Sequence, residues 1–229
     1  MDEFARYAIF AVPDGAFFRT ASTWLGWDSA AGIEVAHPDL PNLPASEAAI
    51  LTATPRKYGF HGTLKPPFRL ARGTTRGELE AAIAAFCAAR PGVEIPRLAI
   101  RAMGGFVAAV PATPQPDLSA LAAAIVAGFD PFRAAAPPDE LTRRRKAGLS
   151  ENQELMLRHW GYPYVFDEFR FHLTLTGKID GTAAEETASR LSEHFAPVLP
   201  APYAIDNLCM LGEASDGRFH ILNRYPLTG

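Results

Sequence analysis

One short pattern occurs twice in this chain of 229 residues, and it limits the possible folds more than any other feature. The first copy is Tyr-Gly-Phe-His-Gly-Thr-Leu-Lys at residues 58–65, and the second is Phe-Arg-Phe-His-Leu-Thr-Leu-Thr at residues 169–176. Both read aromatic-x-aromatic-His-x-Thr-Leu. Because successive side chains of a strand point to opposite faces, each copy predicts a half-buried strand with one apolar face and one polar face.

The polar faces of these two predicted strands carry the same chemistry. We expect His61, Thr63 and Lys65 on the first strand, and His172 and Thr174 with a neighbouring arginine on the second. A spacing of two residues puts the imidazole and the hydroxyl on the same face, ~6.6 Å apart along the strand. This separation suits the binding of one phosphate group.

The surroundings of the motif are repeated as well. A motif strand, a helix, a strand, a turn and a strand follow one another at about 58–110 and again at 169–223. A matched motif at the same place in both copies of such a unit indicates an internal repeat. We therefore predict one bilobed domain over residues 1–229, with halves at about 1–113 and 114–229. A pseudo-twofold axis would turn both polar strand faces toward one cleft.

Composition excludes several classes of function. The net charge is −3 and the isoelectric point is near 6.1, so the chain lacks the overall positive charge of a general nucleic-acid binder. Cys87 and Cys209 both lie in apolar surroundings, which predicts buried thiols without a disulfide. With no signal peptide and no apolar run of membrane-spanning length, we expect a soluble cytoplasmic protein without membrane or long nucleic-acid partners. The oligomeric state stays open.

Two histidines on opposite sides of one group can act as an acid and a base. The ordinary pKa of histidine, about 6.5, allows both protonation states near neutral pH. A neutral imidazole can take a proton from a nucleophile while a protonated one gives a proton to the leaving group. Thr63 and Thr174 could donate hydrogen bonds to the charged phosphate oxygens, and Lys65 and Arg170 could add positive charge. This scheme requires neither a metal nor a cofactor.

The doubled His-x-Thr-Leu resembles the motif of the two-histidine (2H) phosphoesterase superfamily, which includes bacterial RNA 2′,3′-cyclic phosphodiesterase/ligase-type proteins. One branch, associated with phosphonate metabolism, is more similar still. That likeness rests on Arg-Lys-Tyr-Gly-Phe-His-Gly-Thr-Leu-Lys-Pro-Pro-Phe at 56–68, Trp-Gly-Tyr-Pro-Tyr-Val at 160–165 and Glu-Phe-Arg-Phe-His-Leu-Thr-Leu-Thr at 168–176. The likeness spans most of the chain.

The resemblance implies an α+β fold in which antiparallel sheets face a central cleft and the helices lie outside. It also implies metal-independent opening of a small cyclic phosphate, with His61 and His172 as acid and base and with Thr63 and Thr174 binding the phosphate. A nucleoside 2′,3′-cyclic phosphate and a cyclic ribose phosphate are both candidates, the latter from the phosphonate context. The resemblance leaves open the natural substrate, the regioselectivity, and which histidine is the base.

Other interpretations of the motif remain. The fold could serve as a non-catalytic phosphate- or nucleotide-binding module, or the protein could process RNA ends as a 2′–5′ phosphodiesterase or ligase. Binding of RNA ends would require a wider positively charged groove or aromatic side chains on which bases stack. A zinc site would need three or four ligands at a known spacing. The remaining histidines, His37, His159, His194 and His220, do not supply that spacing.

Three further features have an ordinary and a functional interpretation. The basic run Arg143-Arg144-Arg145-Lys146 is typical of a solvated helix face, although one member could meet a second phosphate. Tyr164 comes just before the second motif strand and could stack on a sugar or base. His220 could reach the cleft or lie on the surface, and Tyr58 is assigned to packing.

Overall fold

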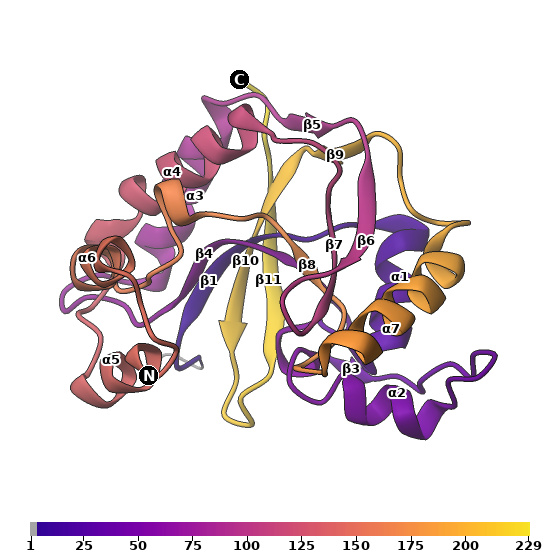
Figure 1. Ribbon diagram of the computed structural model, residues 1–229. Helices are drawn as coiled ribbons and strands as arrows, with labels where there is room; N and C mark the ends of the chain where they lie inside the picture. Colours follow the sequence, from indigo (N-terminus) through magenta and orange to yellow (C-terminus); the bar gives the residue numbers. More distant parts are fainter. Residues whose placement is uncertain (1–3) are drawn as a thin grey trace.

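A seven-stranded antiparallel sheet forms the centre of the computed structural model, which describes residues 4–229 (Figure 1). Across the sheet the strands lie in the order β11, β10, β1, β4, β8, β7, β6. Their bounds are Tyr7–Ala11 (β1), Gly62–Phe68 (β4), Leu98–Ala102 (β6), Val107–Pro111 (β7), Leu173–Thr174 (β8), Asn207–Glu213 (β10) and Phe219–Pro226 (β11). Two small sheets pair β2 (Trp27–Asp28) with β3 (Ile33–Glu34) and β5 (Val93–Ile95) with β9 (Tyr203–Ile205).

Helices surround this sheet, so the predicted α+β class is confirmed. They are α1 (Gly15–Leu25), α2 (Ala45–Leu51), α3 (Arg76–Ala88), α4 (Pro116–Gly128), α5 (Pro138–Arg145), α6 (Glu151–Trp160) and α7 (Gly181–Phe195). Short 3₁₀ helices occupy Arg56–Tyr58, Asp130–Phe132 and Phe166–Glu168. In Figure 1, α3 and α4 lie on one side of the strands, α1 and α7 on the other, and α5 and α6 project beyond α3 and α4.

The repeated unit is visible in the order of the elements. A strand, a helix and three strands follow one another as β4-α3-β5-β6-β7 and again as β8-α7-β9-β10-β11. Corresponding strands pair with each other, β4 with β8 and β5 with β9. Each half also completes the other's side of the sheet, because β6 and β7 continue from β8, whereas β10 and β11 lie beyond β1 and β4. Both halves therefore contribute to one continuous sheet.

The two faces of the sheet are buried to different extents. The larger apolar cluster lies on one face, and α3, α4 and α7 contribute to it. A smaller cluster of seven residues, built around Phe10 and Phe219, lies on the other face. Strand β1 is buried throughout because Ile9 enters the larger cluster and Phe10 the smaller one. The apolar run of β1 is therefore typical of a central strand covered on both faces.

Both motif strands are shorter than predicted. The chain turns sharply before β4, where Gly59 has φ +72°, and a Cβ atom on this residue would lie 2.6 Å from Ser29 Oγ. Such a positive φ is open to glycine and strained for other residues. Residues 58–61 consequently lie outside the strand, and in the second copy only Leu173 and Thr174 belong to β8.

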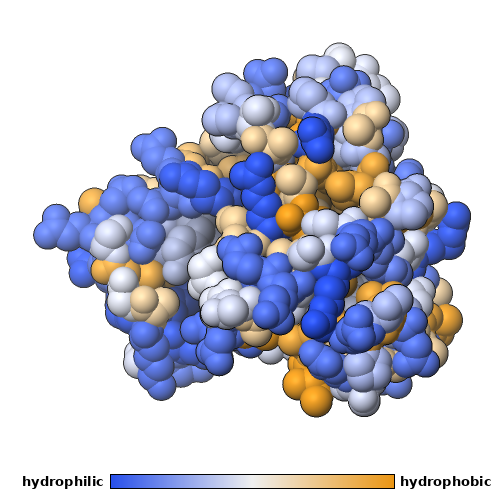
Figure 2. Space-filling view, turned by 45° about the vertical axis from the view of Figure 1, so that its right-hand side comes forward, coloured by the Kyte–Doolittle hydropathy of each residue, from blue (hydrophilic) through white to orange (hydrophobic). Residues whose placement is uncertain are grey.

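Hydrophilic residues predominate on the face shown in Figure 2, and apolar residues occur there as small separate groups. Within residues 4–229, no helix combines the length and the apolar character that crossing a bilayer requires. Cys87 and Cys209 are both free and buried, as predicted.

Candidate active site

The pairing of β4 with β8 brings the two motifs side by side. Gly62 lies opposite Leu173 in this antiparallel pair. Continuing this register by one residue in each direction would put His61, which precedes β4, opposite Thr174, and Thr63 opposite His172, which precedes β8. In that register the four side chains share one face, and the two histidines are diagonal neighbours, about 7 Å apart at Cβ. That separation leaves room for one phosphoryl group hydrogen-bonded on each side.

Gly62 allows this close pairing. A Cβ atom at this position would lie 2.3 Å from Cε2 of Phe171, because the phenyl ring occupies the space where a side chain would stand. Phe171 is buried in the larger apolar cluster. The absence of a side chain at Gly62 thus lets the aromatic residue of one motif pack across the strand of the other.

His61 is held in one tautomer. Its Nδ1 lies 2.9 Å from the carbonyl oxygen of Gly59, which can only accept, so Nδ1 carries the proton. Its Nε2 lies 3.1 Å from Thr63 Oγ1, which donates to the ring lone pair. The ring stacks on Phe10 with centroids 3.8 Å apart. Burial lowers the pKa of His61 to about 4, and the charge of nearby His172 lowers it too, although the bond to Gly59 opposes both. His61 is therefore neutral at pH 7.

His172 is oriented by the same arrangement. Its Nδ1 donates to the carbonyl oxygen of Arg170 at 2.7 Å, again two residues earlier in the chain. Phe106, in the turn between β6 and β7, lies beside the imidazole with ring centroids 5.6 Å apart. Each imidazole thus uses Nδ1 to bind the backbone two residues earlier, while Nε2 of His61 accepts from Thr63.

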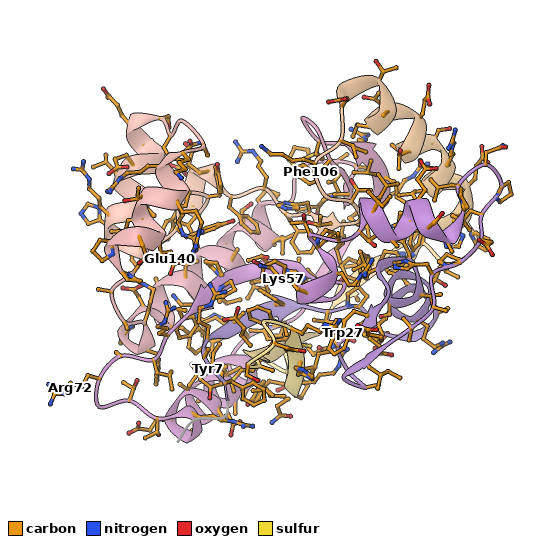
Figure 3. The ribbon with its side chains drawn as sticks, turned by 90° about the horizontal axis from the view of Figure 1, so that it is seen from below. Tyr7, Trp27, Lys57, Arg72, Phe106 and Glu140 are labelled. Carbon is orange, nitrogen blue, oxygen red and sulfur yellow. The ribbon has the colours of Figure 1, made fainter. Side chains whose placement is uncertain are left out.

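A cavity of about 260 Å³ lies beside these residues. His61, Thr63 and Thr174 line it, together with Tyr58 and Phe10, whereas His172 is not among the lining residues. Figure 3 views this region from below, where Lys57 lies between Glu140 of α5 on one side and Trp27 and Phe106 on the other. The cavity wall therefore combines a neutral imidazole, two hydroxyl groups and aromatic rings.

Lys65 does not lie where strand alternation places it. Phe10 pairs with Thr63, but the preceding residue Ile9 pairs with Lys65, so Leu64 is an extra residue in β4 and forms a β-bulge. The bulge turns Lys65 to the opposite face, where it is buried and its Nζ donates to the carbonyl oxygen of Val126 at 3.0 Å. The prediction that Lys65 shares the polar face with His61 and Thr63 is wrong.

Arg170 and Tyr164 also lie outside this cavity. Arg170 turns back on its own segment, and its Nη1 donates to the carbonyl oxygens of Asp167 and Phe169. Tyr164 is exposed and meets the ring of Tyr162 edge-on. The short β8 explains the position of Arg170, because residue 170 precedes the strand and does not follow its alternation. Neither residue contacts the cavity that Thr63 and Thr174 line.

Four wall residues were missed or misassigned. Arg6 precedes β1, Arg144 comes from α5, and Tyr162 lies in the segment after α6. Tyr58, assigned to packing, lines the cavity while stacking on Phe219 with centroids 5.1 Å apart. The only sequence signal for any of the missed residues was the basic run 143–146, of which Arg144 alone lines the cavity.

His220 lies away from the site. Its ring meets Trp27 edge-on with centroids 5.2 Å apart, and it fills the space beside Gly32. Within the described part of the chain, no three His, Cys, Asp or Glu side chains form a group that could hold a metal ion. The metal-independent, cofactor-free scheme stays a prediction.

Residues 63–220 match the family described as "Protein of unknown function (DUF1045)". Two curated relatives are named ribose 1,5-bisphosphate phosphokinase PhnN. The protein from Janthinobacterium sp. (strain Marseille) is 35% identical over 100% of this chain and 52% of its own length, and that from Laribacter hongkongensis (strain HLHK9) is 32% identical over 93% and 49%. The chain thus spans about half the length of these relatives.

Solved structures with a loosely similar fold include LigT from E. coli in complex with NADP⁺ and TT0787 from Thermus thermophilus. The LigT match has a TM-score of 0.45 and 15% identity and covers 99% of this chain and 100% of the other. The TT0787 match has a TM-score of 0.46 and 12% identity and covers 98% of both chains. At these TM-scores and identities, the similarity to the solved structures does not identify an activity for this chain.

Proposed function

Because the chain belongs to the DUF1045 family, whose description names no activity, we propose from the site that it opens a small cyclic phosphodiester by acid–base catalysis with His61 and His172. The observation that carries the proposal is the pairing of Gly62 with Leu173. This pairing brings the two motifs together beside a cavity that His61, Thr63 and Thr174 line, and both imidazoles use Nδ1 to bind the backbone two residues earlier, which supports the proposal.

His61 is the base in this proposal. Its Nε2 has a lone pair at neutral pH, because burial holds its pKa near 4 and Nδ1 keeps the ring proton. In the hydrolysis step a water molecule attacks phosphorus and gives its proton to Nε2 of His61. The bond from phosphorus to one ring oxygen breaks, and His172 gives the Nε2 proton to that leaving oxygen. A cyclic diester and water become a phosphomonoester.

The threonines stabilise charge on the phosphate. Thr63 Oγ1 now donates to His61 Nε2, and a bound phosphate would offer it a charged acceptor in place of the imidazole. Thr174, opposite His61 on β8, lines the same cavity. Hydrogen bonds aimed at oxygens that gain charge in the transition state contribute to catalysis.

The size of the cavity limits the substrate. Its volume of about 260 Å³ lies below the usual range of about 300–1,000 Å³ for small-molecule sites. A cyclic ribose phosphate suits this space better than a long RNA end. The names of the curated relatives also refer to a ribose phosphate, which supports a sugar phosphate as the substrate class.

The kinase name of these relatives does not lead to a kinase site here. This chain contains no G-x-x-x-x-G-K-[S/T] sequence, the loop with which P-loop kinases bind nucleotide phosphates. It spans about half of each relative, so the named activity belongs to proteins about twice as long.

The test is turnover of cyclic ribose phosphates and nucleoside 2′,3′-cyclic phosphates by purified protein treated with EDTA. We expect activity that resists EDTA and falls about 100-fold or more in both His61→Ala and His172→Ala. His159→Ala is the matched control, since His159 is exposed on α6 and its Nδ1 contacts the carbonyl oxygen of Leu155. Full activity in either site variant would rule out the acid–base pair, and phosphate binding without turnover would favour a binding module.

A further inference from the structure

Arg144 differs from the other members of its basic run. Arg143, Arg145 and Lys146 are exposed, whereas Arg144 is half-buried and lines the cavity. Arg145 points toward α6, where it pairs with Glu154 at 2.8 Å. One arginine of the run is thus directed toward the two-histidine site from a helix that carries none of the catalytic residues.

The guanidinium of Arg144 is incompletely satisfied. Its Nη2 donates to Glu140 Oε1 at 2.8 Å, and its centre lies 4.8 Å from the ring centroid of Tyr162. Its Nε is buried and has no hydrogen-bond partner among residues 4–229. A buried donor without an acceptor is costly, so a turn of this side chain that brings Nε to a ligand oxygen in the cavity would be favourable.

The carboxylates that pair with the arginines of this wall lie outside the cavity lining. Glu140 is shared, because Arg69 also pairs with it at 3.4 Å. Arg6, which lines the same cavity, forms a bidentate pair with Glu213. The charged side chains of the cavity lining itself are therefore the guanidiniums of Arg6 and Arg144.

We propose that the substrate of the two-histidine site carries a second, terminal phosphate, which Arg144 binds with help from Arg6. Arg6 and Arg144 line the same small cavity as His61, Thr63 and Thr174, so one ligand could touch the arginines and these three residues. A guanidinium suits a phosphate because its N–H groups match the spacing of the phosphate oxygens. A pentose with a cyclic phosphate at one end and a phosphomonoester at the other fits this arrangement. The proposal rests on the function proposed above and names its substrate class.

The first test uses two small cyclic pentose phosphates that differ only in a terminal phosphate. We expect the wild-type protein to prefer the phosphorylated compound at least tenfold in kcat/KM. Arg144→Gln should reduce this preference at least tenfold, mainly through KM. Arg144→Lys should restore part of the preference, because lysine has the positive charge but lacks the paired N–H groups of the guanidinium. Arg143→Gln makes the same change in charge at an exposed position and should keep the preference. Equal kcat/KM for the two compounds in wild type, or an unchanged preference in Arg144→Gln, would overturn the proposal.

A binding measurement separates this subsite from the catalytic proposal. Ribose 5-phosphate carries a terminal phosphate and no cyclic diester, and its affinity can be measured by calorimetry, with circular dichroism as a check on folding. We expect at least tenfold weaker binding to Arg144→Gln than to Arg143→Gln, and a smaller loss in His172→Ala. If neither cyclic compound is turned over but this pattern holds, the catalytic proposal fails and the subsite stands. If Arg144→Gln binds as tightly as wild type, the subsite is excluded whatever the turnover.

Discussion

At the residue scale, the site depends on how each imidazole is held. His61 and His172 both donate from Nδ1 to the carbonyl oxygen two residues earlier, so the backbone of each motif fixes its own tautomer. The difference lies in the environment, since His61 stacks on Phe10 and is desolvated. In the first motif the result is a desolvated imidazole that is neutral at pH 7.

This burial makes the stability of the protein depend on pH. The pKa of His61 falls from its ordinary 6.5 to about 4 on folding, so between these values the unfolded chain binds a proton that the folded one does not. Above pH 6.5 the histidine is neutral in both states and contributes nothing. We expect wild type to lose on the order of 3 kcal/mol more unfolding free energy than His61→Gln between pH 7 and pH 4. Urea unfolding at both pH values measures this, and equal losses would mean that His61 titrates normally.

At the element scale, local irregularities decide which motif residues face the cavity. Perfect alternation from His61 places Lys65 beside it, and the bulge at Leu64 reverses that placement. Nothing in a single sequence marks this bulge, because it follows from the pairing of β4 with β1. The alternation correctly predicted the shared face of His61 and Thr63, which lie on one side of the bulge.

The buried Lys65 has a structural role. Val126 lies in the last turn of α4, where carbonyl groups lack helical partners, and the ammonium group binds one of them. Lys65→Ala should cost about 2–4 kcal/mol of unfolding free energy through the cavity and the lost bond. The KM for a cyclic phosphate should change less than twofold. A large rise in KM at unchanged stability would contradict the structural role and indicate that Lys65 binds substrate.

The contact between Gly62 and Phe171 can be tested with paired substitutions. Gly62→Ala puts a methyl group within the phenyl ring of Phe171, so we expect a loss of more than about 2 kcal/mol, measured by thermal unfolding. Phe171→Leu alone should also destabilise, by leaving a gap. The double variant Gly62→Ala/Phe171→Leu should be more stable than the sum of the two losses predicts, because the clash is relieved. Strict additivity would show that the two sites do not interact.

At the scale of the whole molecule, the repeat is the part that the sequence revealed best. The doubled motif predicted a motif strand, a helix and two further strands in each half, and the structure shows this order with one strand more in each half and with corresponding strands paired. The motif does not indicate that β7 of the first half pairs with β8 of the second half, with β6 beyond β7. Arg6 and Tyr162 were missed for the same reason, since only tertiary packing brings them to the cavity.

Because each half completes the other's side of the sheet, we expect the chain to unfold as one unit. Near-ultraviolet and far-ultraviolet circular dichroism should report one coincident transition in urea, with a single midpoint. Two separated transitions would show that residues 1–113 and 114–229 are independent domains, contrary to the predicted single domain.

A crystal structure with phosphate or vanadate bound and no added metal tests the two-histidine site directly. We expect one anion within hydrogen-bonding distance, about 2.7–3.2 Å, of Nε2 of both His61 and His172. The hydroxyl groups of Thr63 and Thr174 should bind oxygens of the same anion at the same distance. An anion bound elsewhere, with the two imidazoles turned apart or separated by protein side chains, would contradict the proposed two-histidine site.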